Sequence, residues 1–479
     1  MPSRAESAGR PALPRDRWRP RALACGLAAR ALLSAAAAAV LWVSGQASGD
    51  PARGREPLWP QAPEGERRAR IERLVLEPAR DLPDEARERR LEEMAGSSFA
   101  FLRGSAALFH RDLEASRAFE RQAAVKALPA IVIQGDAHAL NVGAFEDGDG
   151  RLIFDLNDFD EARVGDFRAD LWRVAVSLRL LAQELGALKS ESVDAAVGAL
   201  AQSYLEQLLA FADGDDEASF RLDAQSARGP ARRLILEARE EEGREAMLRE
   251  WTRGRGEKRR FRAGSKIARV APETERALRS ALASSAFADR FEADSLSVLA
   301  VARRLRAGLG SLGVDRFYVL IEGPGPGGLD DVILDFKAQP ELPRAPGSAS
   351  PLAGSPGCRV SRAEELLLAA GDPYLGCLSF GGQSFSVRQR NPLKKSMKAR
   401  KLEGSGDLAS LGREIGRVLA AAHARGAASF DDSAAALFSG SGAAAAARRT
   451  FSREVLEFSA AYARQVERDL EILRGALPR

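Results

Sequence analysis

Two short segments of the chain contain side chains that can bind a metal ion and move a proton. Residues 135–141 read GDAHALN, which places Asp136 and Asn141 five positions apart in one loop. The apolar, β-branched residues 131–133 predict a short buried strand that ends just before Asp136. A predicted strand hairpin then returns the chain to the same end, where Asp158 follows. Carboxylate and amide oxygens are hard ligands that suit Mg²⁺ rather than Zn²⁺.

The types and order of these side chains fit phosphoryl transfer. Mg²⁺ seldom sits in an all-protein cage, so the phosphate groups of a bound substrate would complete its coordination. In such a reaction one carboxylate accepts or orients the attacking hydroxyl group, while Asn and Asp hold the metal. We therefore predict Asp136 as the catalytic base and Asn141 and Asp158 as magnesium ligands. Asp155 is the alternative second ligand. Because Asp and Asn also form ordinary turns, neither segment alone would support this prediction.

The two segments are similar to motifs of the aminoglycoside and choline phosphotransferases. Residues 135–141 resemble their GDxHxxN catalytic loop, and residues 158–162 (DFDEA) resemble their metal-binding segment, IDFxDA. The resemblance implies the base and metal-ligand roles given above. It also matches Asp170, which is followed by Leu, to the structural Asp at the head of the next helix. Gln134 departs from the pattern, since these families usually have His at this mostly structural position.

The nucleotide-binding elements of a kinase are predicted after the catalytic loop rather than before it. Residues 308–313 (GLGSLG) form a GxGxxG pattern. A strand is predicted to follow, which favours a phosphate-covering loop of the kinase type over a dinucleotide-binding helix. Lys337 ends the next predicted strand and is predicted to pair with the nucleotide phosphates. The alternative is a flexible turn and an ordinary surface lysine. The predicted loop contacts are Gly308, Gly310, Ser311 and Gly313.

Two further positions complete the predicted nucleotide site. Glu364 or Glu365, on the helix after Lys337, is the predicted ionic partner of that lysine. Gln389 ends a predicted strand, residues 384–389, that leads into the adenine-contacting hinge. The predicted cofactors are therefore ATP and Mg²⁺.

This motif order predicts an α+β, two-lobed, protein-kinase-like fold, resembling the aminoglycoside phosphotransferases, with a large helical lobe and a small antiparallel-sheet lobe. The fold is circularly permuted, cut before the catalytic loop and rejoined end to end. Residues 169–300 are predicted to be almost entirely helical, and residues 315–322 and 331–336 to form a hairpin. The predicted units are a signal peptide or membrane anchor (1–49), a linker (50–66), the helical catalytic lobe (67–300), the nucleotide-binding lobe (301–400) and returning helices (401–479).

The pattern also resembles an uncharacterised bacterial family, domain of unknown function 2252, over residues 69–426. The shared segments are FAFLRG, GDxHxxN, FDxNDFDE, the GxGSxG loop and a late YVRQ-like strand. Arg362 stands where relatives carry Glu, which bears on the predicted Lys–Glu pair. The family name implies no known substrate. In this chain the segments are residues 99–104, 135–141, 154–161, 308–313 and 386–389.

Several other side chains lie in or near the predicted site segments. Arg103 would contact a phosphate or an acidic substrate, or form a structural salt bridge. His138 is predicted to bond the backbone of the catalytic loop. The basic cluster of Lys394, Lys395 and Lys398 is predicted to be a solvated turn. The three cysteines, Cys25, Cys358 and Cys377, give neither a metal spacing nor a disulfide framework, and three histidines in the whole chain argue against zinc.

Composition limits the class of protein. Of the 479 residues 45% are hydrophobic, enough to bury a sizeable core. The 71 basic and 67 acidic residues leave a net charge of only +4, so no nucleic-acid partner is predicted. Arginines precede an apolar run at residues 31–43, which predicts an export signal or anchor, hence membrane association and a place in the cell envelope. The alternative is an Ala/Arg-rich extension or a start site assigned too far upstream, with a cytoplasmic protein.

The predicted reaction is ATP- and Mg²⁺-dependent transfer of the γ-phosphoryl group to a hydroxyl group of an unknown acceptor. Two other functions stay open. The same parts can bind ATP in a flipped pose and transfer a nucleotidyl (AMP) group. A pseudokinase, a nucleotide-binding regulatory module without turnover, is favoured by the Arg362 departure and by an export signal. Retention of Asp136 argues against it, because a binding module needs no base.

Overall fold

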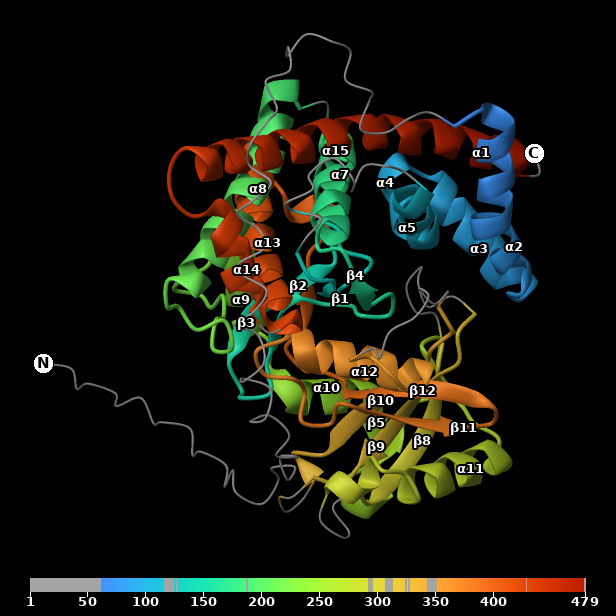
Figure 1. Ribbon diagram of the computed structural model, residues 1–479. Coiled ribbons are helices and arrows are strands. Elements are labelled where there is room, and N and C mark those ends of the chain that lie inside the picture. The colour runs from blue at the N-terminus through green and yellow to red at the C-terminus, as the bar shows by residue number, and fades with distance from the viewer. Residues whose placement is uncertain are drawn as a thin grey trace, which may run out of the picture.

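A computed structural model shows a helical lobe above a lobe built on a β-sheet (Figure 1). The predictions for residues 1–49 and for most of the 50–66 linker lie outside the described part of the chain, and so do Gly308, Gly310 and Ser311. The structure describes residues 62–115, 125, 128–186, 188–291, 296–305, 313–323, 325, 328–342, 351–427 and 429–477.

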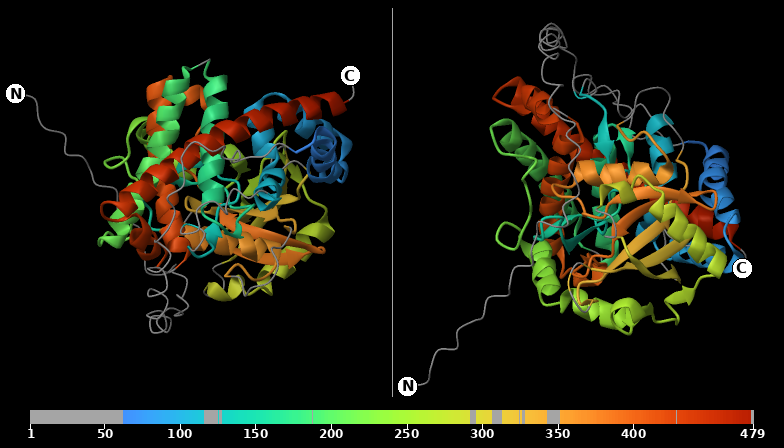
Figure 2. Two further views of the ribbon diagram at one scale, coloured as in Figure 1. Left: turned by 45° about the horizontal axis from the view of Figure 1, so that its top comes forward. Right: turned by 90° about the horizontal axis from the view of Figure 1, so that it is seen from below.

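The helical lobe is formed by both ends of the chain. In the left view of Figure 2, the long helix α15 crosses the other helices of this lobe and contacts α7 and α8. Among the described residues no helix is both long and apolar enough to cross a membrane. The N-terminal part contains α1 (Glu64–Ile71), η3 (Glu72–Leu76), α2 (Glu77–Arg80), α3 (Asp84–Ala95), α4 (Ser98–Gly104) and α5 (Ala106–Ala115). The rest contains α7 (Arg168–Glu184), α8 (Ser190–Ala212), α9 (Gly229–Arg239), α13 (Ser405–Gly426), α14 (Phe430–Phe438) and α15 (Ala443–Ala476).

Helix α13 lies at the centre of this lobe, as its apolar periodicity predicts. Leu408, Leu411 and Ile415 recur at helical spacing, and all three are at most 1% exposed. The helix packs tightly against α8 because small residues line the contact. A Cβ atom at Gly416 would lie 2.5 Å from the carbonyl oxygen of Leu200, so only glycine allows this approach.

A buried polar network joins the first helix of the lobe to the last. Arg67 of α1 donates from Nε to Oδ1 of Asp469 in α15 at 2.7 Å, and from Nη1 to Asp112 of α5 at 2.7 Å. Tyr462 donates its hydroxyl to the same Asp112 at 2.7 Å. Because all of these groups are buried and paired, the two ends of the described chain are held together.

The second lobe contains an antiparallel sheet with the strand order β11-β12-β10-β9-β8-β7. The predicted hairpin is confirmed, since β9 and β10 pair from Ile321↔Val332 to Arg316↔Lys337. Helix α12 lies between the sheet and the helical lobe, and α11 covers the opposite face (Figure 1). The strands are β7 (Ile267–Arg269), β8 (Val298–Arg304), β9 (Arg316–Ile321), β10 (Val332–Ala338), β11 (Gly376–Phe380) and β12 (Gln383–Gln389). The helices are α10 (Gly243–Trp251), α11 (Pro272–Ala283) and α12 (Pro356–Leu367), with η5 (Gly256–Lys258), η6 (Ala288–Arg290), β5 (Thr252–Arg253) and β6 (Arg260–Phe261) nearby.

Alternation along β10 decides which side chains face the helical lobe. Leu334 and Phe336 belong to the hydrophobic cluster that includes α11. Their neighbours Asp335 and Lys337 therefore point to the opposite face, because successive strand residues alternate. This alternation places two charged side chains on the side of the sheet that faces residues 131–165, which contain the predicted site residues and are named the catalytic segment for that reason.

The prediction that residues 169–300 are almost entirely helical is wrong. Strand β7 and the start of β8 fall within this range and belong to the sheet, so this lobe begins well before residue 300. The sequence of β8, VLAVARR, contains Ala and Arg, which favour helices, but pairing with β7 and β9 determines its conformation. Strand β11 was also not predicted.

Short strands carry the catalytic segment between the two lobes. Strand β1 (Ile131–Ile133) pairs with β4 (Arg163–Gly165), and β2 (Val142–Glu146) forms a hairpin with β3 (Leu152–Leu156). Both the predicted strand at residues 131–133 and the hairpin after it are confirmed. Strand β13 (Lys395–Ser396), from the C-terminal side of the sheet lobe, pairs with β2. Antiparallel pairing among the described strands, together with the helical lobe, makes the fold α+β as predicted.

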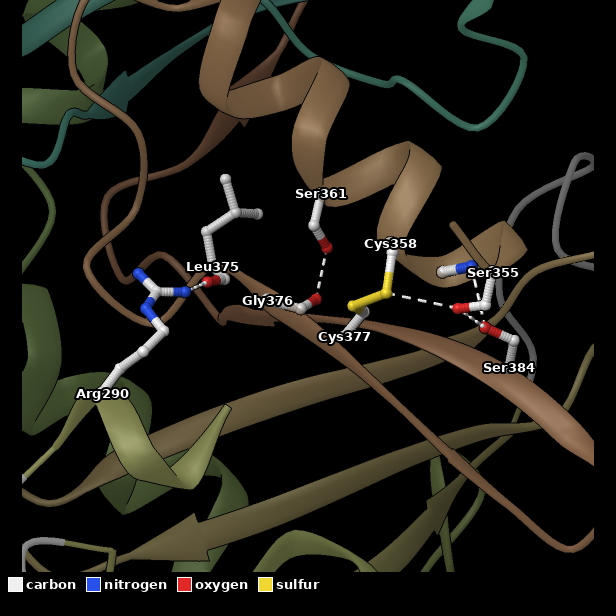
Figure 3. Close-up of a disulfide and its surroundings, with 9 residues drawn as sticks. Arg290, Ser355, Cys358, Ser361, Leu375, Gly376, Cys377 and Ser384 are labelled. Atoms are coloured by element: carbon white, nitrogen blue, oxygen red, sulfur yellow. Dashed lines mark hydrogen bonds between the residues drawn. A yellow bond between two sulfur atoms is a disulfide. The ribbon is translucent and has the colours of Figure 1, made fainter. Parts of the chain in front are cut away.

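A disulfide fastens α12 to the sheet. Cys358, in the first turn of α12, is bonded to Cys377 of β11, with the two Cα atoms 4.9 Å apart (Figure 3). Ser361, one turn further along α12, donates its hydroxyl to the carbonyl oxygen of Gly376. The pair contradicts the expectation that the cysteines form no disulfide framework. The sequence could not indicate it, because only the packing of α12 on β11 brings the two residues together.

Candidate active site

The catalytic loop is held at its start by the carboxylate of Asp170, in the first turn of α7. Asp170 is fully buried and accepts hydrogen bonds from the backbone N–H groups of Gln134 at 2.6 Å and Gly135 at 2.9 Å. On its far side lies His423 of α13, whose ring also contacts Tyr204. One carboxylate thus fixes the two peptide units that precede Asp136.

Glycine is the only residue type that fits position 135 in this turn. Its φ is +82°, and a Cβ atom here would lie 2.0 Å from the carbonyl oxygen of Glu161. The carbonyl oxygen of Gly135 lies 2.5 Å from Nε2 of His110. Burial lowers the pKa of His110 well below its ordinary value, so the ring is neutral and donates through Nε2. His110 was not predicted as part of the site.

Asp136 lies at the end of β1, with 22% of its side chain exposed. The fully buried Arg173 of α7 donates from Nε to Asp136 Oδ1 at 2.9 Å. Burial raises the pKa of Asp136 to about 7, and Arg173 acts in the opposite direction. Arg173 was missed in the sequence. The signal that could have found it is its position three residues after Asp170, on the same face of the helix.

His138 forms the contact predicted for it with the loop backbone. Its Nδ1 atom accepts from the N–H group of Leu140 at 3.2 Å, and Phe99 packs edge-on against the ring at 5.9 Å. Burial lowers its pKa well below the ordinary value, with the positive charge of Arg103 acting in the same direction, so the ring is neutral. The proton therefore lies on Nε2, which is 3.9 Å from Oδ2 of Asp136.

Asn141 and Asp158 are brought together by bonds between their two segments. Asn141 donates its side-chain amide to the carbonyl oxygen of Asp136 at 3.1 Å, and its own carbonyl oxygen accepts from the N–H group of Asn157 at 3.2 Å. The side chain of Gln134 donates to the carbonyl oxygen of Asp158 at 2.9 Å. Gln134, the departure from the phosphotransferase pattern, therefore links the two loops.

The donor set fits magnesium. Asn141 uses its amide nitrogen on the protein, which leaves the amide oxygen available as a ligand. Burial would raise the pKa of Asp158, but the positive charges of Lys337, Arg388 and Lys394 outweigh it and lower this pKa to about 2. Asp158 is therefore ionised at neutral pH. Among the described residues no group of three or more His, Cys, Asp or Glu side chains could hold a metal ion by itself.

Lys337 points into the site but does not form the predicted pair with Glu364 or Glu365. It forms an ion pair with Asp160, whose other oxygen accepts from Gln339 Nε2 at 2.8 Å. Lys337 lies at the end of β10 that faces the 158–160 turn, whereas Glu364 faces β12. As a result Glu364 Oε2 lies 3.6 Å from Nη1 of Arg388, and Glu365 pairs with Arg362 on the surface of α12.

A cleft of about 620 Å³ opens between the lobes. Gln389, at the end of β12, lines it and donates its backbone N–H to Asp372. Lys394 lines it as well. Burial lowers the pKa of Lys394 to about 7, and Arg388 acts in the same direction. The expectation of a solvated turn holds for the exposed Lys398. It is wrong for Lys394, which lines the cleft, and for Lys395, which lies in β13 and pairs with Glu241.

The remaining predicted residues that the structure describes do not contact Asp158. Asp155 is 2% exposed in β3, and its Oδ2 atom is 3.9 Å from Arg425, so it is not beside Asp158 as a second metal ligand. Arg103 is exposed in the last turn of α4. Gly313, the described residue of the predicted phosphate loop, has a φ of +76° and lies against Leu82.

The comparisons with known proteins agree with the family resemblance seen in the motifs. The model of a family described as uncharacterized proteins conserved in bacteria (DUF2252) matches residues 82–476. No curated protein and no solved structure matches the chain. Because the match includes the catalytic segment, the sheet lobe and the returning helices, the chain belongs to the DUF2252 family.

Proposed function

We propose that this protein is a phosphotransferase that uses Mg²⁺ and ATP and moves the γ-phosphoryl group to a hydroxyl group of an acceptor. The observation that carries the proposal is the joint positioning of Asp136, Asn141 and Asp158. Gln134 ties the Asp158 loop to the catalytic loop, and Asp170 holds the backbone of both Gln134 and Gly135. These bonds fix the backbone on both sides of the acidic segments, as a site that must hold a reacting ligand in one geometry requires.

Each residue then has a distinct task. Asp136 would take the proton of the acceptor hydroxyl, since a pKa near the working pH suits a general base. Asn141 and Asp158 would hold the metal, with phosphate and water oxygens as its other ligands. When bound, Mg²⁺ neutralises charge on the phosphate oxygens. Lys337, now paired with Asp160, would contact a phosphate oxygen from the sheet side.

We further propose that the fold is protein-kinase-like and circularly permuted. In an unpermuted chain, a helix equivalent to α13 would lead directly into the catalytic loop. Helix α13 ends beside β1: a Cβ atom at Gly426 would lie 2.8 Å from the carbonyl oxygen of Val132. The C-terminal end of α13 and the strand that carries Asp136 are therefore neighbours in space, although they are far apart in sequence. This proximity supports the permutation.

The test is Mg²⁺-dependent binding of ATP to the purified full-length protein, measured by calorimetry. Wild type is compared with Asp158→Asn and with the matched control Asp155→Asn, which changes a buried carboxylate that faces away from the site. Binding should require Mg²⁺, be lost in the Asp158 variant and persist in the Asp155 variant. A wild-type protein that binds no ATP with Mg²⁺ or Mn²⁺ would overturn the proposal.

The position of the transferred label then identifies the reaction. Label from γ-labelled ATP on a hydroxyl-bearing acceptor supports phosphoryl transfer. Label from the α position instead would show nucleotidyl transfer and contradict the proposal. Metal-dependent binding with no transfer to any acceptor and no hydrolysis would assign the protein to the pseudokinases.

A further inference from the structure

Two cationic side chains face the cleft from different parts of the chain. Arg388 extends from β12, and Lys394 lies in the segment that leads from the sheet lobe to α13. The closest ionic contact of Arg388 is Glu364, with an N–O distance of 3.6 Å, which is too long for a good hydrogen bond. Among the described residues, the side chains of Arg388 and Lys394 make no hydrogen bond, and Lys394 makes no ion pair.

Two other cations that line this region are held by carboxylates. Arg316 donates from Nε to Oδ1 of Asp335 at 2.7 Å and makes a second contact with Oδ2. Lys395, the sequence neighbour of Lys394, forms an ion pair with Glu241. Arg388 and Lys394 differ from these two residues, because their donors make no hydrogen bond to a described residue and can bind a ligand.

Both cations also lie near the predicted metal ligand, and Arg388 lines a small pocket together with Asp158. Both act electrostatically on Asp158, and each acts on the other. Their mutual repulsion is offset in part by Asp158 and Glu364, whose negative charges act on both cations. A metal ion bound at Asp158 would remove part of this compensation, and phosphate oxygens would replace it. A ligand with several negatively charged oxygens would use the fork of the guanidinium group and the ammonium group together.

We propose that Arg388 and Lys394 form a second phosphate clamp, which binds the polyphosphate chain of the nucleotide in addition to Lys337. This inference rests on the proposed function and specifies how the same site holds its substrate. Arg388 belongs to β12 of the sheet lobe, and Lys394 belongs to the segment that leads into α13. Phosphates bound by both residues would therefore bridge these two parts of the chain.

The test compares Lys394→Met with Lys395→Met as a matched control. Both variants remove an ammonium group from the cleft wall, but Lys395 is already paired with Glu241. Binding of Mg–ATP, inorganic tripolyphosphate and adenosine is measured by calorimetry on full-length protein. Lys394→Met should weaken the two phosphate-containing probes by about 10- to 100-fold, as expected for loss of a charged hydrogen bond. Adenosine binding, and all binding by Lys395→Met, should stay near wild type.

Two further variants make the result decisive. Lys394→Arg should restore most of the affinity, since charge rather than shape is required, and Arg388→Gln should lose affinity for the same two probes. If wild type binds Mg–ATP and Asp158→Asn does not, but Lys394→Met binds normally, the clamp is wrong and the proposed function stands. If wild type binds no Mg–ATP, the proposed function fails, and the clamp fails as a nucleotide site. Lys394-dependent binding of tripolyphosphate would then show that the cleft binds a polyanion that is not a nucleotide.

Discussion

Arg173 holds one oxygen of Asp136 and leaves the other free. Its Nε donates to Oδ1 at 2.9 Å, and its Nη2 also donates to the carbonyl oxygen of Leu102 at 2.6 Å. These bonds hold the Nε/Nη2 edge of the guanidinium group, which fixes the orientation of the Asp136 carboxylate. The free oxygen, Oδ2, lies on the side of His138 and is the atom that can accept a proton from an acceptor hydroxyl.

Replacement of Asp136 by Asn should separate chemistry from binding. The amide oxygen can keep the bond from Arg173, so the loop should retain its shape, but the amide cannot act as a base. We expect transfer or hydrolysis of γ-labelled phosphate to fall about 100- to 10,000-fold. Mg–ATP affinity, measured by calorimetry on the same preparation, should stay unchanged. Turnover at the wild-type rate would remove Asp136 from the chemistry.

Replacement of Asp170 by Asn should destabilise the protein. Asn offers one acceptor oxygen in place of two, and its NH₂ group would face a backbone N–H group that has lost its partner. We expect a loss of about 2–4 kcal/mol in the free energy of unfolding, measured by urea denaturation. Asp215→Asn, at an exposed position after α8, is the control and should change stability by less than about 0.5 kcal/mol. Equal stability of the two variants would contradict the proposed role of Asp170 in holding the loop backbone.

Reduction of the Cys358–Cys377 disulfide should lower the stability of the sheet lobe. The two cysteines are 19 residues apart, and closing a loop of that length stabilises a folded chain by about 3 kcal/mol on the chain-entropy estimate. Unfolding by urea, followed with and without a phosphine reductant, measures the loss. The double variant Cys358→Ser with Cys377→Ser should show the lower stability and no response to the reductant. A wild-type protein whose stability is unchanged once its thiols are shown to be reduced would refute this.

Stability should depend on pH through Asp155. Burial raises its pKa to about 6, above the ordinary value of 3.8, so the folded protein binds this proton more tightly than the unfolded chain. The resulting stabilisation is complete below pH 3.8 and is lost as the pH rises through 6, a change of about 3 kcal/mol. Asp155→Asn has no such proton. Relative to this variant, wild type should be more stable at pH 4 than at pH 7 in urea unfolding; a constant difference would count against the assignment.

Local patterns were sufficient where neighbouring residues decide the structure. The apolar run of β1, the β9–β10 hairpin and the stripe that includes Leu408 and Ile415 follow periodicities that a sequence shows directly. The catalytic segment was also visible, because Asp136 and Asn141 lie in one loop. These features depend on contacts within a short stretch of chain, so their sequences carry most of the information.

Contacts between distant segments were not visible in the sequence. Lys337 and Asp160 are 177 residues apart, and only the approach of β10 to the 158–160 turn makes them partners. The same holds for Cys358 with Cys377, and for Lys394, whose neighbours come from β12, α12 and the catalytic segment. Strand β8 was taken for helix because its own residues favour helix, while its partners in the sheet favour the strand. In each case tertiary packing overrode the local signal.

The ion pair between Arg67 and Asp469 has a consequence for how the protein is made. A ribosome releases α1 and the catalytic loop first, but the helices that pack around them, α13 and α15, are synthesised only near the end of the chain. Until Asp469 has left the exit tunnel, Arg67 lacks one of its two carboxylate partners, and the helical lobe cannot close. A nascent chain therefore exposes the apolar sides of β1 and α7 through most of translation. The catalytic loop is among the first parts of the domain to be translated and among the last to be fixed in place.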